Sequence, residues 1–258
     1  MWDCPSFLNL PDRAGKPRTH GVTHVLDKGM TISALEALLT HTGHLIDVIK
    51  IGWGVAYIDP ALKERVALCE SAGVLTCLGG TLLEVAEAQG RIEPLADWAV
   101  QVGIAAVEVS NGLRAIGPTR KTELVRTLSE KFIVLAETGA KDGHVPVVAA
   151  DWVDEMETDL DAGARWVVVE GRESGTVGLY HEDGSLRTDL VDAIANRLPV
   201  HRVIFEAPRK AQQAWLIQRF GADVNLGNVP PEEVIPLETL RLGLRADTAV
   251  IDHVKAGR

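Results

Sequence analysis

Eight short apolar runs recur along the chain, and each ends in glycine or in a polar residue. Short runs of Val, Ile and Leu are typical of parallel strands that are buried on both faces. A helix-forming stretch follows almost every run, and eight strand–helix units predict an α/β fold, a closed (β/α)8 TIM barrel. In that fold the residues at the carboxyl ends of the strands line the active site. The runs cover residues 22–26, 47–51, 74–78, 105–109, 133–137, 166–170, 203–205 and 223–226.

The length and the cysteine content favour one cytoplasmic barrel. The 258 residues match the roughly 250 residues of a single barrel, so we expect one domain over residues 1–258, with an irregular lead-in at 1–20 and a tail at 247–258. No apolar run approaches the roughly 20 residues of a membrane span, and the first residues lack a signal-peptide pattern. The three cysteines include no Cys-x-x-Cys pair, which favours reduced thiols in the cytoplasm.

The charge of the chain narrows its partners. A formal net charge of −10 argues against nucleic acid and against an anionic membrane surface. Against this acidic background, several basic residues stand at or just after predicted strand ends. Such a local positive field suits a small polyanion that carries phosphate or carboxylate groups. These basic residues are Lys28, Lys50, Arg172, Arg209 and Lys210.

Three carboxylates close successive predicted strands, namely Glu108, Glu137 and Glu170. Because neighbouring strand ends face one mouth of a barrel, these residues can together bind Mg²⁺, a hard ion that takes oxygen ligands. The alternative is that they form ion pairs with Lys141 or with basic residues of the rim, Lys50 and Arg172, and only organise that rim. The sequence leaves both interpretations open.

The lysines nearest the predicted mouth are Lys28, Lys50 and Lys141. A lysine that stands among other cations has a lowered pKa and can act as a proton donor or base. The alternative for each is a simple counter-ion for phosphate or carboxylate. Lys141 follows Gly139, so we expect it on a loop.

Two segments near the end of the chain predict a phosphate site. Arg209 and Lys210 open a predicted helix over residues 210–220, and Gly227 and Asn228 follow the last predicted strand. Barrel enzymes often hold phosphate with the loops after strands seven and eight, where backbone N–H groups at a helix start meet the anion. We therefore assign these four residues to substrate binding.

Ser110 and Asn111 follow the fourth predicted strand, and we assign them to substrate binding as well. No His and acid partners for a nucleophilic serine are recognisable in the sequence, so Ser110 is expected to position a substrate. Residues 171–187 form a long Gly-rich segment with few helix signals, and loops of that length are functional or disordered.

Several of these strand-end segments, in register, resemble the phosphosulfolactate synthase family of (β/α)8 barrels. The resemblance extends from about Gly21 to Thr248, and several motifs together are more specific than any one of them. The matching motifs are VLDKG at 25–29, KIGWG at 50–54, GGT at 79–81, EGRESG at 170–175, FEAPRK at 205–210, VNL at 224–226 and LETLR at 237–241.

The resemblance implies Mg²⁺-dependent addition of sulfite to phosphoenolpyruvate, which gives 2-phospho-3-sulfolactate. The family feeds coenzyme M biosynthesis in methanogens and sulfolactate formation in some bacteria, and it suggests a homo-oligomer such as a trimer. On this basis Glu108, Glu137 and Glu170 would surround the metal, and Lys141 would protonate C2. The basic residues of the rim, Lys28 and Lys50 among them, would bind the anions.

The chain departs from the family pattern at two places. It has Asn111 before Gly112 where archaeal synthases have Asp, and Val55 where a hydroxyl residue is common. The family also includes heat-stress-associated members for which synthase activity is not a safe assumption. Two alternatives therefore stay open: a barrel enzyme that adds another small nucleophile to phosphoenolpyruvate, and a non-catalytic, stress-associated barrel that acts through protein partners.

Overall fold

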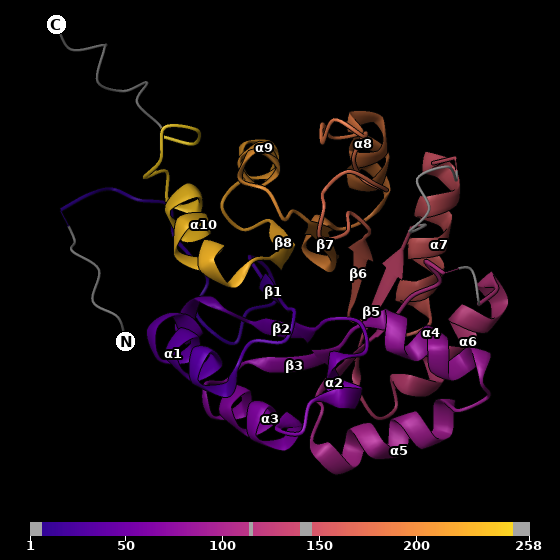
Figure 1. Ribbon diagram of the computed structural model, residues 1–258. Helices are drawn as coiled ribbons and strands as arrows, with labels where there is room; N and C mark the ends of the chain where they lie inside the picture. The colour runs from indigo at the N-terminus through magenta and orange to yellow at the C-terminus, as the bar shows by residue number, and fades with distance from the viewer. Residues whose placement is uncertain (1–6, 114–115, 140–145, 250–258) are drawn as a thin grey trace, which may run out of the picture.

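The strands form the closed parallel barrel that the sequence predicts. The computed structural model describes residues 7–113, 116–139 and 146–249. Each strand pairs in parallel with the next, and the eighth pairs with the first, so the sheet closes on itself (Figure 1). The strands are β1 (Thr23–Asp27), β2 (Val48–Ile51), β3 (Leu75–Leu78), β4 (Ala106–Val109), β5 (Ile133–Thr138), β6 (Trp166–Val169), β7 (Val203–Glu206) and β8 (Asn225–Val229).

Helices surround the strands and cover the outer face of the barrel (Figure 1). Helix α1 begins where Thr31 accepts a hydrogen bond from the N–H of Ala34, as the capping preference of threonine predicts. The helices are α1 (Ile32–Thr42), α2 (Val55–Ile58), α3 (Leu62–Ser71), α4 (Gly80–Ala88), α5 (Ile92–Val102), α6 (Pro118–Leu128), α7 (Ala149–Asp161), α8 (Thr188–Arg197), α9 (Lys210–Phe220) and α10 (Val234–Arg241), with 3₁₀ turns η1 (Gly43–Leu45), η2 (Val200–Arg202) and η3 (Pro231–Glu233). Within the described ranges, no helix has both the length and the apolar character of a membrane span.

Strand alternation separates an apolar layer from a charged layer inside the barrel. The apolar layer is a cluster of buried strand residues that includes Val48, Ala106, Leu135, Val168 and Ile204. Side chains alternate along a strand, so the residue two positions further on faces the same way. Those residues lie at the carboxyl ends of the strands and are charged: Lys50, Glu108, Glu137, Glu170 and Glu206.

The last strand differs from the sequence prediction. We expected it over residues 223–226 with Gly227 and Asn228 after it, but β8 runs from Asn225 to Val229 and contains both. Asparagine and glycine are poor strand formers, which hid this strand from the pattern. The barrel satisfies the Asn225 amide, whose Oδ1 accepts from the N–H of Val22 at 2.9 Å.

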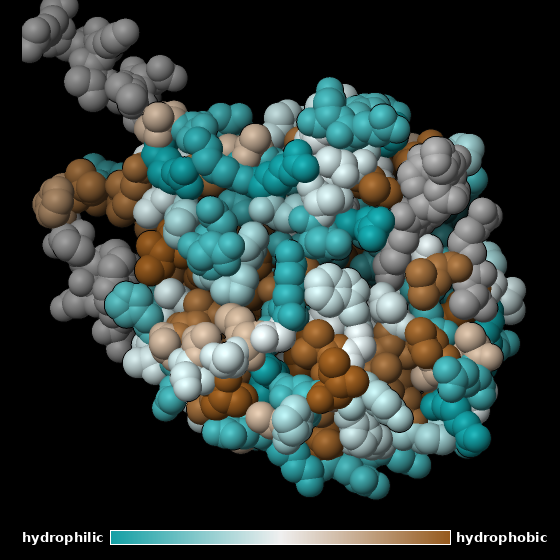
Figure 2. Space-filling view, in the orientation of Figure 1, coloured by the Kyte–Doolittle hydropathy of each residue, from teal (hydrophilic) through white to brown (hydrophobic). Residues whose placement is uncertain are grey.

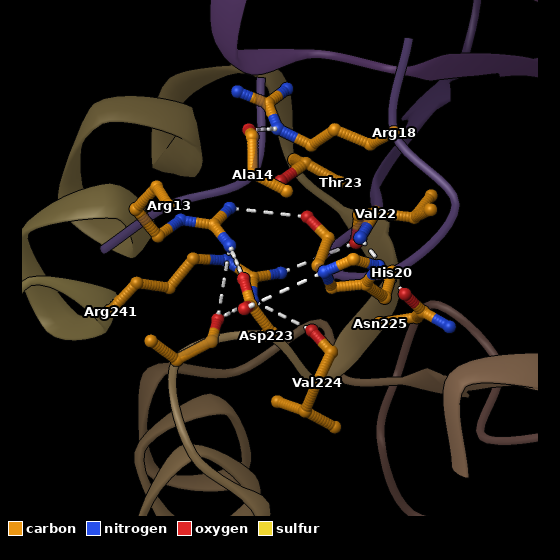
Figure 3. A network of polar contacts seen from close by, with 12 residues as sticks. Arg13, Ala14, Arg18, His20, Val22, Thr23, Asp223, Val224, Asn225 and Arg241 are labelled. Carbon is orange, nitrogen blue, oxygen red and sulfur yellow. Dashed lines mark hydrogen bonds and ion pairs between the residues drawn. The ribbon is translucent and has the colours of Figure 1, made fainter. Parts of the chain in front are cut away.

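Two arginines tie the beginning and the end of the chain together where β1 meets β8 (Figure 3). Residues 7–22 form no helix or strand, yet Arg13 within them forms ion pairs with Asp223 at 2.6 Å and with Glu238 at 2.9 Å. The buried Arg241 of α10 donates to the backbone carbonyls of Val224 at 2.6 Å and Val22 at 3.2 Å. These contacts hold the barrel closed at its one non-sequential strand pair.

Candidate active site

A cavity of about 540 Å³ lies at the carboxyl ends of the strands. Its wall brings together the three carboxylates that the sequence singled out, Glu108, Glu137 and Glu170, and two of the basic residues, Lys50 and Arg172. The three carboxylates and Lys50 are almost completely buried. Four of the five residues of the charged layer, all except Glu206, therefore form the floor of this cavity.

Lys50 is enclosed by carboxylates. Its Nζ lies 2.8 Å from Oε1 of Glu206, 3.0 Å from Oε2 of Glu108 and 4.0 Å from Oε2 of Glu137. Burial lowers the pKa of Lys50, but these carboxylates outweigh burial and hold the pKa well above its usual value. Lys50 is therefore a fixed positive charge, and the ion pair that the sequence left as an alternative is present.

Glu108 is held by donors on both of its oxygens. Oε1 accepts from the N–H of Gly80 at 2.9 Å, and Oε2 accepts from Lys50. Burial raises the pKa of Glu108, but Lys50 and the Gly80 N–H outweigh burial and keep the pKa below its usual value. The close approach needs glycine, since a Cβ on Gly80 would lie 2.2 Å from Oγ of Ser110 and 3.3 Å from Oε1 of Glu108.

The carboxylates offer a donor set that fits a hard divalent cation. One oxygen from each of Glu108, Glu137 and Glu206 lies within 4.8 Å of the others. The set that we expected from the sequence contained Glu170 in place of Glu206. Together, four buried carboxylates outnumber the two cations of the cavity wall, Lys50 and Arg172. Carboxylate oxygens are the ligands that Mg²⁺ prefers. The four carboxylates are Glu108, Glu137, Glu170 and Glu206.

Glu206 is a site residue that the sequence analysis did not select. It ends β7 and is fully buried, and its side chain contacts Lys50 directly. Its position at the end of the seventh apolar run, inside the FEAPRK motif, was the signal available. In the same segment, Arg209 and Lys210 are the stronger signal for an anion site, because they stand at a predicted helix start.

The backbone is strained at three points around the cavity. Trp53, Arg172 and Asn228 have φ angles of 50°, 55° and 51°, in the left-handed region that residues other than glycine rarely adopt. All three line the cavity. Strained backbone of this kind clusters at functional sites.

A smaller cavity of about 370 Å³ adjoins the first. Lys28, an exposed residue after β1, lies in its wall. The two cavities share Leu26, Glu173 and Asn228, so they are neighbouring parts of one depression. Lys28 thus belongs to the same mouth as Lys50, although it does not line the larger cavity.

The other residues assigned to substrate binding lie outside the cavity walls. Arg209 and Lys210 are exposed at the start of α9, and Lys210 pairs with Asp247 at 2.9 Å. Ser110 donates to Glu84 at 2.5 Å, behind the wall. Asn111 is half-buried and precedes Gly112, which does line the larger cavity.

Two further assignments have separate outcomes. Gly227 is buried within β8, where a Cβ would lie 2.9 Å from Ile204 and 3.2 Å from Nδ1 of His24. Lys141 lies outside the described residues.

His24 is a second residue that the sequence analysis did not select. It is fully buried on β1, and its Nδ1 accepts from the N–H of Asn228 at 3.3 Å. Burial, and then Lys50, lower the pKa of His24 to about 3. The imidazole is therefore neutral and supports the strained backbone at Asn228.

Sequence comparison assigns the chain to a family. The model of the (2R)-phospho-3-sulfolactate synthase family matches residues 11–247. The phosphosulfolactate synthase of Methanothermobacter thermautotrophicus is 41% identical over 92% of this chain and 95% of its own length. The phosphosulfolactate synthase of Bacillus subtilis is 34% identical over 93% and 97%. The Arabidopsis thaliana protein HEAT-STRESS-ASSOCIATED 32 is 24% identical over 92% and 91%.

Solved structures agree on the fold alone. A 3-hexulose-6-phosphate synthase superimposes with a TM-score of 0.53 at 14% identity, covering 83% of this chain and 97% of its own. The citrate synthase SbnG superimposes with a TM-score of 0.54 at 12% identity, covering 84% and 89%. The family match covers most of the chain, and the synthases are more than 30% identical to it. The chain therefore belongs to the phosphosulfolactate synthase family of enzymes.

Proposed function

We propose that this enzyme adds sulfite to phosphoenolpyruvate in a Mg²⁺-dependent reaction that gives 2-phospho-3-sulfolactate. The observation that carries the proposal is the charged floor of the larger cavity, where Lys50 and Arg172 stand among buried carboxylates. Both substrates are small anions, and a cavity of about 540 Å³ is within the usual range for small-molecule sites.

Glu108, Glu137 and Glu170 would hold the Mg²⁺. All three line the cavity, and Glu108 and Glu137 each offer an oxygen to the closely spaced carboxylate group. When bound, Mg²⁺ would supply positive charge that stabilises the negative charge developing on the substrate carboxylate.

The cationic side chains would stabilise the same charge from the protein. Sulfur of sulfite forms a bond to C3 of phosphoenolpyruvate, and the electrons of the double bond move toward C2 and the carboxylate. Lys50, as a fixed positive charge, and Arg172, a cationic residue of the cavity wall, suit this developing charge. Lys28 in the adjoining cavity suits the second anionic group.

A proton delivered to C2 completes the addition, and we propose Lys141 as its donor. Gly139 lies against Glu170, since a Cβ on Gly139 would be 2.4 Å from Cβ of Glu170. Lys141 follows two residues later in the chain. Gly139, the last described residue before Lys141, thus lies beside a residue of the cavity wall.

The test follows phosphoenolpyruvate by ³¹P NMR with purified enzyme, Mg²⁺ and sulfite. We expect a new phosphate-ester peak that requires all three, that Lys141→Ala abolishes and that the exposed-site control Lys131→Ala keeps. A peak that survives in Lys141→Ala contradicts only the choice of donor. Shifts with phosphoenolpyruvate but no turnover would indicate another nucleophile. The absence of both turnover and binding would favour a non-catalytic, stress-associated barrel.

We also propose that the enzyme assembles as a homo-oligomer. Apolar side chains are exposed on α2 and α4, with Tyr57 at 75%, Ile58 at 79% and Val85 at 43%. Figure 2 shows hydrophobic residues around α2, whereas hydrophilic residues dominate over α9 and α10. Light scattering should give a mass above the 27.8 kDa of one chain, and Ile58→Asp should lower it. A monomer at all concentrations contradicts this proposal.

A further inference from the structure

Glu206 accepts more hydrogen bonds than its place among the carboxylates requires. Its Oε1 accepts from Nζ of Lys50 at 2.8 Å, and its Oε2 accepts from the backbone N–H groups of Gly171 and Arg172, both at 2.8 Å. Its own backbone carbonyl accepts from the hydroxyl of Tyr180 at 2.5 Å. One fully buried residue thus connects β2, β7 and two points of the segment after β6.

This pattern separates Glu206 from the proposed metal ligands. A carboxylate oxygen has two lone pairs, and both lone pairs of Oε2 are occupied by backbone donors. Each oxygen of Glu108, by comparison, receives a single donor. The spacing of the Glu206 oxygens permits a metal contact, but their hydrogen bonds indicate that the residue holds other groups in place.

The groups that Glu206 holds are those that need support. Arg172 has a φ of 55°, and its N–H also donates to Oε1 of Glu170 at 2.8 Å. Gly171 is enclosed, since a Cβ there would lie 2.7 Å from the ring of Tyr180 and 2.9 Å from the carbonyl oxygen of Glu206. Without Glu206, the N–H of Gly171 would lose its carboxylate acceptor, and the left-handed Arg172 would keep only the acceptor that Glu170 provides.

We infer that Glu206 is a positioning residue that fixes the Lys50 ammonium and the Arg172 backbone, so that both cationic side chains converge on the anionic substrate. The inference rests on the proposed function insofar as phosphoenolpyruvate is that anion. Glu206 acts through Lys50 and Arg172 and does not itself touch the substrate.

The test compares Glu206→Gln with Glu238→Gln. Like Glu206, Glu238 is buried and forms an ion pair, in its case with Arg13. It belongs to the closure between β1 and β8. Hydrogen exchange of the intact proteins gives a readout that needs no substrate. Because an amide oxygen is a weaker acceptor than a carboxylate, Glu206→Gln should speed exchange at Gly171 and Arg172 about tenfold. Glu238→Gln should leave exchange there unchanged.

Calorimetry with phosphoenolpyruvate and Mg²⁺, without sulfite, supplies the second readout. We expect Glu206→Gln to weaken phosphoenolpyruvate binding about tenfold in the wild-type background and clearly less in an Arg172→Ala background, since the share of the effect that acts through Arg172 is then already lost and only the share through Lys50 remains. The affinity for Mg²⁺ should stay within about threefold, whereas Glu137→Gln should lower it by more.

The outcomes distinguish the inference from the proposed function. Unchanged exchange at Gly171 and Arg172, additive effects in the double variant, or a loss of Mg²⁺ affinity equal to that of Glu137→Gln would each overturn the positioning role. Wild-type protein that fails to bind phosphoenolpyruvate would contradict the proposed substrate, and the exchange comparison would still decide the role of Glu206. If Glu206→Gln does not fold, Tyr180→Phe should speed exchange over the same segment to a smaller extent.

Discussion

A buried cation among carboxylates makes each charge depend on the others. Lys50 lies within 4.0 Å of oxygens from Glu108, Glu137 and Glu206, and all four residues are nearly inaccessible to water. Desolvation of each charge is unfavourable, and the mutual attraction offsets it only while every partner is present. The charges that prepare the cavity for an anion are for that reason also part of the folded core.

Replacing Lys50 by methionine should lower the free energy of unfolding by about 3–5 kcal/mol, because it leaves buried carboxylates without their cation. The matched control is Lys131→Met, which removes an exposed lysine 3.5 Å from Asp97 and should change stability by less than about 1 kcal/mol. Urea unfolding of both variants at pH 7 measures the difference. Equal losses in the two variants would contradict the structural role of Lys50.

His24 should make stability depend on pH. The folded protein keeps His24 neutral down to a pKa of about 3, whereas the unfolded chain protonates it near its ordinary value of 6.5. The unfolded chain therefore binds more protons between these pH values, and the His24 contribution to stability is lost as the pH falls below 6.5. The loss is about 1.4 kcal/mol per pH unit.

His24→Gln removes this contribution. The difference in unfolding free energy between wild type and His24→Gln should therefore shrink from pH 6.5 to pH 4.5. Urea titrations at four pH values in that range give the measurement. A difference that stays constant would show that the pKa of His24 is the same in the folded and the unfolded state.

At the scale of the element, the close approach of α4 to β4 supports the site. The N–H of Gly80, at the start of α4, donates to Glu108, and the space for it exists only because Gly80 has no side chain. Gly80→Ala should lower stability by about 1–3 kcal/mol through overpacking and should reduce kcat/KM by displacing Glu108. Unfolding and steady-state assays measure the two effects.

The control for Gly80→Ala is Gly117→Ala, where a Cβ meets nothing within 4 Å and the backbone φ is −76°. It should be nearly neutral in both assays. Ser110→Gly in the Gly80→Ala background should restore part of the stability, because the side chain of Ser110 is the main obstacle. No recovery would place the strain elsewhere.

The elements themselves were largely predictable from sequence. The bounds of α9 agree with the helix expected over residues 210–220, because apolar spacing and flanking turn residues are local signals. Strand alternation also brought Glu108, Glu137 and Glu170 to one cavity. The spacing of apolar residues and the position of each residue in the sequence were enough to predict these features.

The rest depended on contacts that a one-dimensional pattern does not contain. Strand β8 was misplaced because its asparagines are satisfied by distant residues, Asn225 by Val22 and the N–H of Asn228 by His24. Lys210 stands at a helix start, as expected, but its ammonium pairs with Asp247 outside the cavity walls. The role of Glu206 depends on Lys50, 156 positions earlier in the chain.

For the whole molecule, closure of the barrel depends on contacts between its first and last segments. Arg13, in the lead-in, reaches Asp223 before β8 and Glu238 in α10, while Arg241 binds carbonyls on both sides of the closure (Figure 3). Sequence pattern assigned the lead-in no structural part. It nevertheless joins the two ends of the barrel.

Arg13→Met should lower the free energy of unfolding by about 3 kcal/mol, since it leaves the largely buried Glu238 unpaired. The control is Arg197→Met, which breaks exposed pairs with Asp154 and Glu157 and should cost less than about 1 kcal/mol. Thermal unfolding of both, followed by circular dichroism, gives the comparison. A stable Arg13→Met variant would mean that the strand hydrogen bonds and Arg241 close the barrel without Arg13.

The left-handed residues at the mouth have a consequence for protein engineering. Glycine would relax the backbone at Trp53, Arg172 and Asn228, so a selection that scores only heat resistance would favour it at all three positions. Each exchange would also strip a side chain from the cavity wall. Libraries of this enzyme ranked by melting temperature alone would therefore accumulate variants that are more thermostable but lack these cavity side chains. Turnover has to be part of the selection from its first round.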